Sequence, residues 1–174
     1  MNAVASFTRM FASSSEAPFK RTKIGWILVG LNLFMTVMSI NFFMGMLKTN
    51  FEGWLMMNTC APSIFLFVLG FLLRSPAVMI AGSLAMFRYG TLGLFVFSWS
   101  GGNMVAQVGH ILMTTAVIYT VVDTVRNLRW KSSLAGVVLG IVLLVPFTII
   151  QDAWCKAHAD VVDKLFLGTL TIPE

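Results

Sequence analysis

Apolar residues in this chain form long runs that short polar segments interrupt. The uncharged runs are residues 24–47, 53–73 and 132–151, and a longer run over 75–122 contains a single charge, Arg88. A helix needs about 20 apolar residues to cross a bilayer, so the longest run can cross twice. The polar, glycine-rich segment 98–103 is the turn that we expect to divide it.

This pattern predicts an all-α, polytopic membrane protein built as a bundle of five transmembrane helices. The predicted spans are 24–47, 54–73, 76–97, 104–122 and 133–150. Because the connections are short, we expect one compact transmembrane domain over 24–150. An N-terminal segment, 1–23, precedes this domain and a tail, 151–174, follows it.

Several residues refine the predicted helix ends and contacts. Ser75 and Pro76 favour a helix start, because serine caps the first turn and proline suits it. Pro62 lies about two turns into the second span, where we expect a kink or a helix restart. In the fifth span, Gly136 and Gly140 have the small-xxx-small spacing that lets membrane helices pack closely.

The two terminal segments carry their own patterns. Residues 1–15 are rich in serine, contain Arg9 and lack acids, as organellar transit peptides do. They also suit a short interfacial helix carrying Phe7, Met10 and Phe11, which is the interpretation we favour. Residues 152–167 alternate apolar and charged side chains. This alternation predicts a short amphipathic helix on the outer surface of the membrane.

The placement of lysine and arginine predicts the orientation of the spans. With the N-terminus inside, the inner segments hold Arg9, Lys20, Arg21, Lys23, Arg74, Arg126, Arg129 and Lys131, and the outer segments hold Lys48, Lys156 and Lys164. Because cytoplasmic loops are enriched in basic residues, this distribution favours an N-in, C-out protein. We expect it in a bacterial inner membrane or an organellar membrane. The net charge of +5 is then a topology signal, with contacts to anionic lipids, and not a nucleic-acid-binding surface.

Composition narrows the class of function. The chain is 57% hydrophobic and 11% charged, whereas soluble proteins average about 25% charged residues. All seven acids lie outside the predicted spans, so the spans contain no paired carboxylates for acid–base catalysis. We therefore expect no enzymatic activity from this chain by itself, although it could belong to an enzyme complex.

Arg88 is the most informative residue, because it falls well inside the third predicted span. A guanidinium at that depth costs about 2.5–3.5 kcal/mol on insertion scales and normally needs a partner. Four interpretations remain open. Arg88 could pair with an acid of another subunit, hold the anionic group of a ligand or lipid, attract a permeating anion, or bond to backbone carbonyls while snorkelling.

Polar residues follow one helical face in each of two spans. The first span carries Asn32, Thr36 and Ser39, and the fourth carries Asn103, Gln107, His110 and Thr114. Spacings of three and four residues place each set on one side of its helix. With Arg88, these faces could line a pathway or a buried ligand site, or they could form hydrogen bonds between helices.

Metal and redox chemistry have weaker signals. Met44, Met46, Met56, Met57 and His158 are predicted near the outer side, where thioether and imidazole groups would suit Cu(I). Methionine also fills gaps in apolar cores. Cys60 and Cys155 fall toward the same side and could form a disulfide in an oxidising compartment. His110 could supply one axial ligand to a haem, but this chain has no second intramembrane histidine.

These observations favour a non-enzymatic accessory subunit of a larger membrane complex. Its spans would pack on other membrane subunits and on bound phospholipid, and we favour such a hetero-complex over a homo-oligomer. The alternative is a small oligomeric transporter or channel for a polar or anionic solute, with Asn32, Thr36, Arg88, Gln107 and His110 along its path. A copper-handling membrane protein is the second alternative.

Overall fold

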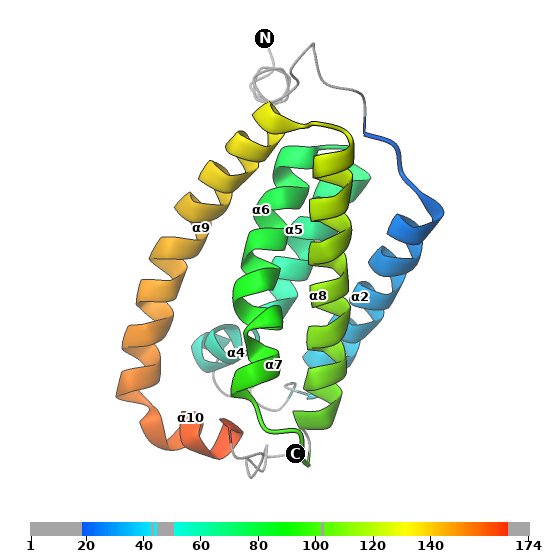
Figure 1. Cartoon of the computed structure of the whole chain (residues 1–174). Coiled ribbons are helices and arrows are strands. Elements are labelled where there is room, and N and C mark those ends of the chain that lie inside the picture. Colours follow the sequence, from blue (N-terminus) through cyan, green and yellow to red (C-terminus); the bar gives the residue numbers. More distant parts are fainter. Residues whose placement is uncertain (1–18, 43, 45–50, 102, 167–174) are drawn as a thin grey trace.

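The computed structural model describes residues 19–42, 44, 51–101 and 103–166. In this part the regular secondary structure is helical, and short connections join the helices (Figure 1). The elements are α2 (Lys23–Phe42), α4 (Phe51–Met57), α5 (Cys60–Leu72), α6 (Pro76–Met86), the π-helical turn η1 (Phe87–Thr91), α7 (Gly93–Val96), α8 (Asn103–Arg126), α9 (Trp130–Ala157) and α10 (Ala159–Phe166). The interfacial helix predicted over 1–15 and the copper candidate Met46 lie outside the described residues.

The helices have the lengths and apolarity that the hydrophobic pattern predicts. Four stretches are long and apolar enough to cross a membrane: α2, the continuous segment α6–η1–α7, α8 and α9. The pair α4 and α5 would make a fifth if their bent arrangement counts as one span. The structure is therefore consistent with an integral membrane protein of four or five spanning segments.

The second predicted span, 54–73, is broken near Pro62 as expected. Asn58 and Thr59 separate α4 from α5, and the two helix axes differ by 68°. Pro62 is the third residue of α5, in the first turn, where its missing N–H leaves no hydrogen bond unmade. The restart that we predicted is thus confirmed, and it produces a sharp turn.

The fifth span is longer than predicted, which corrects the boundary of the tail. α9 continues past 150 to Ala157 with Pro146 inside it, so residues 152–157 belong to this helix. An ion pair from Lys156 Nζ to Asp152 Oδ2 (2.7 Å) joins residues one turn apart and supports the extended end. Only α10 forms the separate short helix, which is strongly amphipathic and lies across the end of the bundle (Figure 1).

Helix α6 is the central element of the bundle, and glycines bring α5 against it. The position that a Cβ of Gly70 would take lies 2.2 Å from the backbone nitrogen of Met79 on α6. Reciprocally, a Cβ on Gly82 of α6 would lie 2.4 Å from the backbone nitrogen of Phe67 on α5. The two backbones can approach this closely only because both positions lack a side chain.

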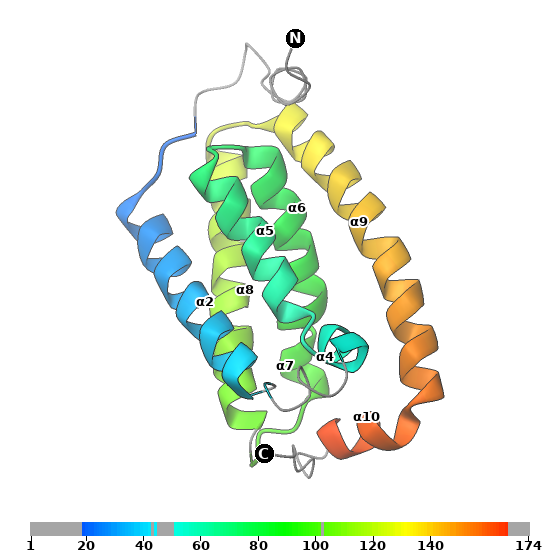
Figure 2. The ribbon, with the colours of Figure 1, turned by 180° about the vertical axis from the view of Figure 1, so that it is seen from behind.

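The predicted packing of the fifth span through Gly136 and Gly140 is confirmed. A Cβ at Gly136 would lie 2.6 Å from the carbonyl oxygen of Ala77, and one at Gly140 would lie 2.9 Å from a methyl of Leu84. Both glycines are buried, and both face α6. Beyond this contact α9 moves away from α6 and α7, as both ribbon views show (Figures 1 and 2).

One end of the bundle gathers the start of α2, the α5–α6 connection and the α8–α9 connection (Figure 2). We call it the basic end, because it holds Lys20, Arg21, Lys23, Arg74, Arg126, Arg129 and Lys131. Arg21 donates to the carbonyl of Leu72, and Arg129 pairs with Asp123 at 3.3 Å. Ser75 caps α6 as predicted, accepting from the backbone N–H of Val78. We call the opposite end, which α10 crosses, the cavity end, because the residues that gather there line a cavity.

The close contact between α6 and α9 predicts a stability difference between two glycine substitutions. Gly136→Ala should lower the free energy of unfolding by about 1–3 kcal/mol, because its Cβ meets Ala77 O and Ile80 Cβ within 2.7 Å. Gly30→Ala is the matched control, since that position is exposed on α2 with open space around it. Unfolding in detergent micelles should show the control to be neutral or stabilised. Equal stability of the two variants would contradict this packing.

Candidate ligand cavity

A cavity of about 410 Å³ lies at the end of the bundle opposite the basic end, and α10 contributes to its lining. Residues from α2, α4, α5, η1, α7, α8, α9 and α10 line it. Helix α4 fills part of the space between α5 and α9, and Gln151 Nε2 holds it by donating to the carbonyl of Met56 at 2.9 Å. The volume is in the range typical of small-molecule sites.

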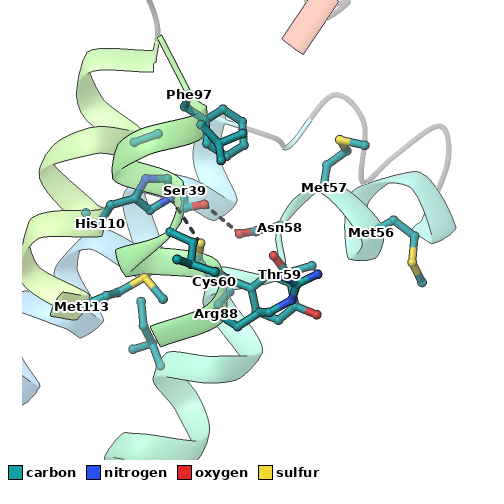
Figure 3. A pocket seen from close by; sticks show the side chains of 18 of the residues that line it. Ser39, Met56, Met57, Asn58, Thr59, Cys60, Arg88, Phe97, His110 and Met113 are labelled. Carbon is teal, nitrogen blue, oxygen red and sulfur yellow. Dashed lines mark hydrogen bonds between the residues drawn. The ribbon is translucent and has the colours of Figure 1, made fainter. Parts of the chain in front are cut away.

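Arg88 lies on the π-helical turn and lines this cavity. The backbone bond from Leu92 N–H to the Phe87 carbonyl spans five residues, which inserts one extra residue into the helix. Such turns are frequent at functional sites, because they change the direction of the side chains they carry. The Arg88 side chain is exposed and reaches toward the break between α4 and α5 (Figure 3).

No ion pair and no hydrogen bond joins Arg88 to any other described residue. Among the described residues, this disfavours the interpretation that Arg88 bonds to backbone carbonyls. Asp152 also lines the cavity, but its carboxylate accepts from Lys156 at 2.7 Å. Arg88 lies well inside the candidate span Pro76–Val96, because at 1.5 Å per helical residue it is about 12 Å from the end of α7 at Val96.

Next to Arg88, Tyr89 connects the π-helical turn to α9. Its hydroxyl lies 3.4 Å from the hydroxyl of Thr148, and its ring meets the edge of Phe147 with 6.2 Å between centroids. Both contacts come after the point at which α9 has left α6. Tyr89 therefore spans the gap at the side of the cavity and helps to fix its width.

His110 sits in the wall of the cavity within a chain of hydrogen bonds. Gln107 Nε2 donates to the carbonyl of Phe97 at 2.8 Å, so Gln107 Oε1 is left to accept from His110 Nδ1 at 3.0 Å. In a neutral imidazole, a protonated Nδ1 makes Nε2 an acceptor. Nε2 lies 3.6 Å from the thiol sulfur of Cys60, which can donate to it (Figure 3).

The remaining members of the α8 stripe bond to the neighbouring segment. Asn103 Nδ2 donates to Ser98 Oγ at 2.9 Å, and the Thr114 hydroxyl lies 3.0 Å from that of Thr91. The stripe is therefore an interhelical hydrogen-bonding face. Two members of the stripe, Asn103 and His110, also line the cavity.

The α2 stripe divides into a buried part, Asn32 and Thr36, and a half-buried residue, Ser39. Asn32 and Thr36 are 0% and 1% exposed, and both donate to carbonyls of their own helix, those of Leu28 and Asn32. Ser39 instead bonds across to Asn58 Oδ1 at 2.8 Å. Thr36 and Ser39 line the cavity together with Arg88 and His110, so the structure brings these predicted residues to one site.

Asn58 and Thr59 were not predicted as site residues from the sequence, whereas Cys60 was predicted only as a disulfide candidate. All three residues line the cavity at the break between α4 and α5. Asn58 is only 2% exposed, and its Nδ2 has no hydrogen-bond acceptor in the described part of the chain. A signal was present, because two adjacent polar residues just before Pro62 mark a helix end inside an apolar run.

The metal and redox candidates are dispersed. Met56, Met57 and Cys155 line the cavity, whereas His158 stacks on Trp154 at 4.2 Å and Met44 is not among the lining residues. Among the described residues, no three His, Cys, Asp or Glu side chains converge as metal ligands would. Cys60 and Cys155 are both free thiols in this structure, so the disulfide stays a prediction.

Comparisons with protein-family models, with curated proteins and with solved structures gave no match.

Gln107 should contribute to stability through the wall of the cavity. Gln107→Leu removes the donor to Phe97 O and the acceptor for His110 Nδ1, which should lower the free energy of unfolding by about 1–3 kcal/mol. Thr115→Val is the matched control on the same helix, because Thr115 is exposed and bonds only to its own turn. Thermal unfolding in detergent should separate the two variants, and an unchanged midpoint for Gln107→Leu would contradict the network.

Proposed function

We propose that this chain is an integral membrane protein that binds an amphipathic anion in the cavity. The ligand would carry a carboxylate or phosphate head on an apolar tail, as fatty acids and anionic lipids do. The proposal rests on the position of Arg88. It is a cation inside a spanning segment, it lines a cavity of ligand size, and no described residue satisfies it.

The energetics of Arg88 favour an anion as its partner. Placing a guanidinium within a span costs about 2.5–3.5 kcal/mol, and an ion pair with hydrogen bonds offsets that cost. A guanidinium binds carboxylate and phosphate groups with two parallel hydrogen bonds, which fixes the head of a ligand in one orientation. Asp152 also lines the cavity, and its carboxylate pairs with Lys156, whereas no described residue pairs with Arg88.

The rest of the cavity suits an apolar tail. Most of its wall consists of aliphatic, methionine and aromatic side chains, among them Met35, Ile64, Leu92, Val96 and Phe97. Polar groups from α2, the α4–α5 break, α8 and α9 interrupt this wall. Predominantly apolar walls with a few placed polar groups are typical of small-molecule sites.

Binding fits this structure better than conduction. Between the cavity and the basic end, side chains that are fully buried fill the bundle, including Phe67, Phe71 and Met79. The transporter alternative would therefore need these packed residues to move. The cavity is therefore confined to one end of the bundle.

Assembly with other membrane subunits remains a second proposal. It is favoured by α9, along which only Ser132, Gly136, Gly140 and Trp154 are buried. The outward face of this helix presents Leu134, Val138, Ile141, Val142, Val145 and Ile149, which either lipid tails or the spans of a partner subunit would cover. This face lies apart from Arg88, so subunit assembly and ligand binding are compatible.

The orientation also belongs to the proposal. If α4 and α5 act as one broken span, the chain crosses the membrane five times. The positive-inside rule then places the basic end in the cytoplasm, and the cavity opens toward the outer leaflet of a bacterial inner membrane or its organellar counterpart.

Replacing Arg88 should weaken binding of anionic amphiphiles. Arg88→Gln removes the charge while keeping a polar side chain, and loss of a charged hydrogen bond predicts an affinity about 10- to 100-fold lower. Arg126→Gln is the control, because Arg126 is an exposed cation at the basic end of α8. Titration of the purified protein with palmitate, with phosphatidate and with neutral monoacylglycerol measures each dissociation constant.

The three ligands distinguish the head groups. Tighter binding of palmitate or of phosphatidate identifies a carboxylate or a phosphate as the preferred head. The proposal is contradicted if monoacylglycerol binds as tightly as both anions, or if Arg88→Gln and Arg126→Gln behave alike.

A further inference from the structure

Cys60, His110 and Gln107 form a chain of polar contacts of the kind that activates a nucleophile. The Cys60 sulfur lies 3.6 Å from His110 Nε2, and His110 Nδ1 lies 3.0 Å from Gln107 Oε1. In cysteine hydrolases a base next to the thiol accepts its proton, and a third group orients the base. Gln107 can take the orienting role, because its own amide is fixed by the Phe97 carbonyl.

The tautomer of His110 suits the role of a base. With the proton held on Nδ1 by Gln107, the lone pair of Nε2 points at Cys60. Cys60 is also the first residue of α5, directly after the break that Asn58 and Thr59 form. Cys60 and His110 both line the cavity, so a ligand there can reach the sulfur.

Asn58 provides a separate observation at the same place. Its side chain is 2% exposed and lines the cavity, and Ser39 fixes its orientation by donating to Oδ1. The remaining group, Nδ2, is a buried donor for which the described chain supplies no acceptor. Buried donors are nearly always paired, so an acceptor oxygen of a ligand is the partner this position calls for. In acyl transfer such a donor stabilises the oxyanion.

We propose that Cys60 accepts an acyl group from an amphipathic acyl ester or thioester bound in the cavity. This inference rests on the proposed ligand cavity and assigns it a reaction. The alternative is that Cys60 and His110 have a purely structural role in the wall of the bundle. The unpartnered Asn58 donor favours the reaction, because the carbonyl oxygen of a bound ester would satisfy it and the described wall of the bundle does not.

The step balances in atoms and charge. The Cys60 sulfur forms a bond to the carbonyl carbon of the ligand while His110 Nε2 takes the thiol proton. The bond from that carbon to the leaving oxygen or sulfur then breaks, and His110 returns the proton to the leaving atom, which departs as an alcohol or a thiol. Attack of water on the S-acyl group releases the fatty acid and restores the Cys60 thiol. Asn58 Nδ2 donates to the carbonyl oxygen throughout, and Arg88 holds the anionic head.

The test uses the full-length protein in detergent with two probes, palmitoyl-coenzyme A as the thioester and dipalmitoyl phosphatidate as the ester. After an acid quench, intact-mass and peptide analysis locate any palmitoyl group, hydroxylamine identifies a thioester linkage, and released palmitate is quantified. Cys155→Ala is the matched control, because Cys155 is the other free thiol in the wall of the cavity.

We expect acylation at Cys60, or palmitate release that depends on Cys60, with at least one probe, and the reactive probe identifies the leaving group. Cys60→Ala should abolish the reaction, while the Cys155→Ala protein should still be acylated at Cys60. Asn58→Leu should slow it about 100-fold or more, and His110→Gln should slow it by about 100- to 10,000-fold. Cys60→Ala should still bind palmitate, which confirms its fold.

Two outcomes would overturn the proposal. One is that neither probe reacts although the protein binds palmitate, in which case ligand binding stands and acyl transfer does not. The other is acylation of Cys60 and Cys155 at equal rates, with no effect of His110→Gln, which would show unassisted thiol chemistry. If the wild-type protein does not bind palmitate, the proposal that the cavity binds an amphipathic anion is itself contradicted.

Discussion

The close approach of α5 and α9 to the central helix α6 is the constraint on which the rest of the structure depends. In a bilayer the hydrophobic effect does not hold helices together, so packing between small residues supplies much of the association. Gly70 and Gly82 bring the backbones of α5 and α6 together, and Gly136 and Gly140 do the same for α9 and α6. All four contacts lie on the side of Arg88 that faces the basic end, which leaves the cavity end of the bundle more open.

The site follows from the places where this packing stops. Once α9 leaves α6, a gap opens that α4, Tyr89 and α10 only partly fill. The π-helical turn brings Arg88 to that gap, and the break before Cys60 adds polar groups of a short non-helical segment. Irregular backbone at membrane depth is tolerated where it lines a cavity, so both irregularities mark the same region.

Much of the architecture could be predicted from sequence, because it depends on local patterns. Run lengths gave the long helices, Ser75 and Pro62 gave a start and a restart, and the glycine spacing gave the contact of α9. The π-helical turn at Arg88 was not predictable, since its sequence reads as ordinary helix. The grouping of Cys60 with His110 was also missed, because it depends on how α5 and α8 cross in three dimensions.

The central claim is that Arg88 receives the anionic head of an amphipathic ligand inside the cavity. An experimental structure of the protein in lipid nanodiscs tests it most directly, through the density within hydrogen-bonding reach of the Arg88 guanidinium. The account predicts an elongated density whose polar end contacts Arg88 and whose tail follows the apolar wall toward Met35 and Ile64. A carboxylate from a neighbouring protein subunit in that place, or a guanidinium bonded to the chain's own carbonyls beside an empty cavity, would contradict it.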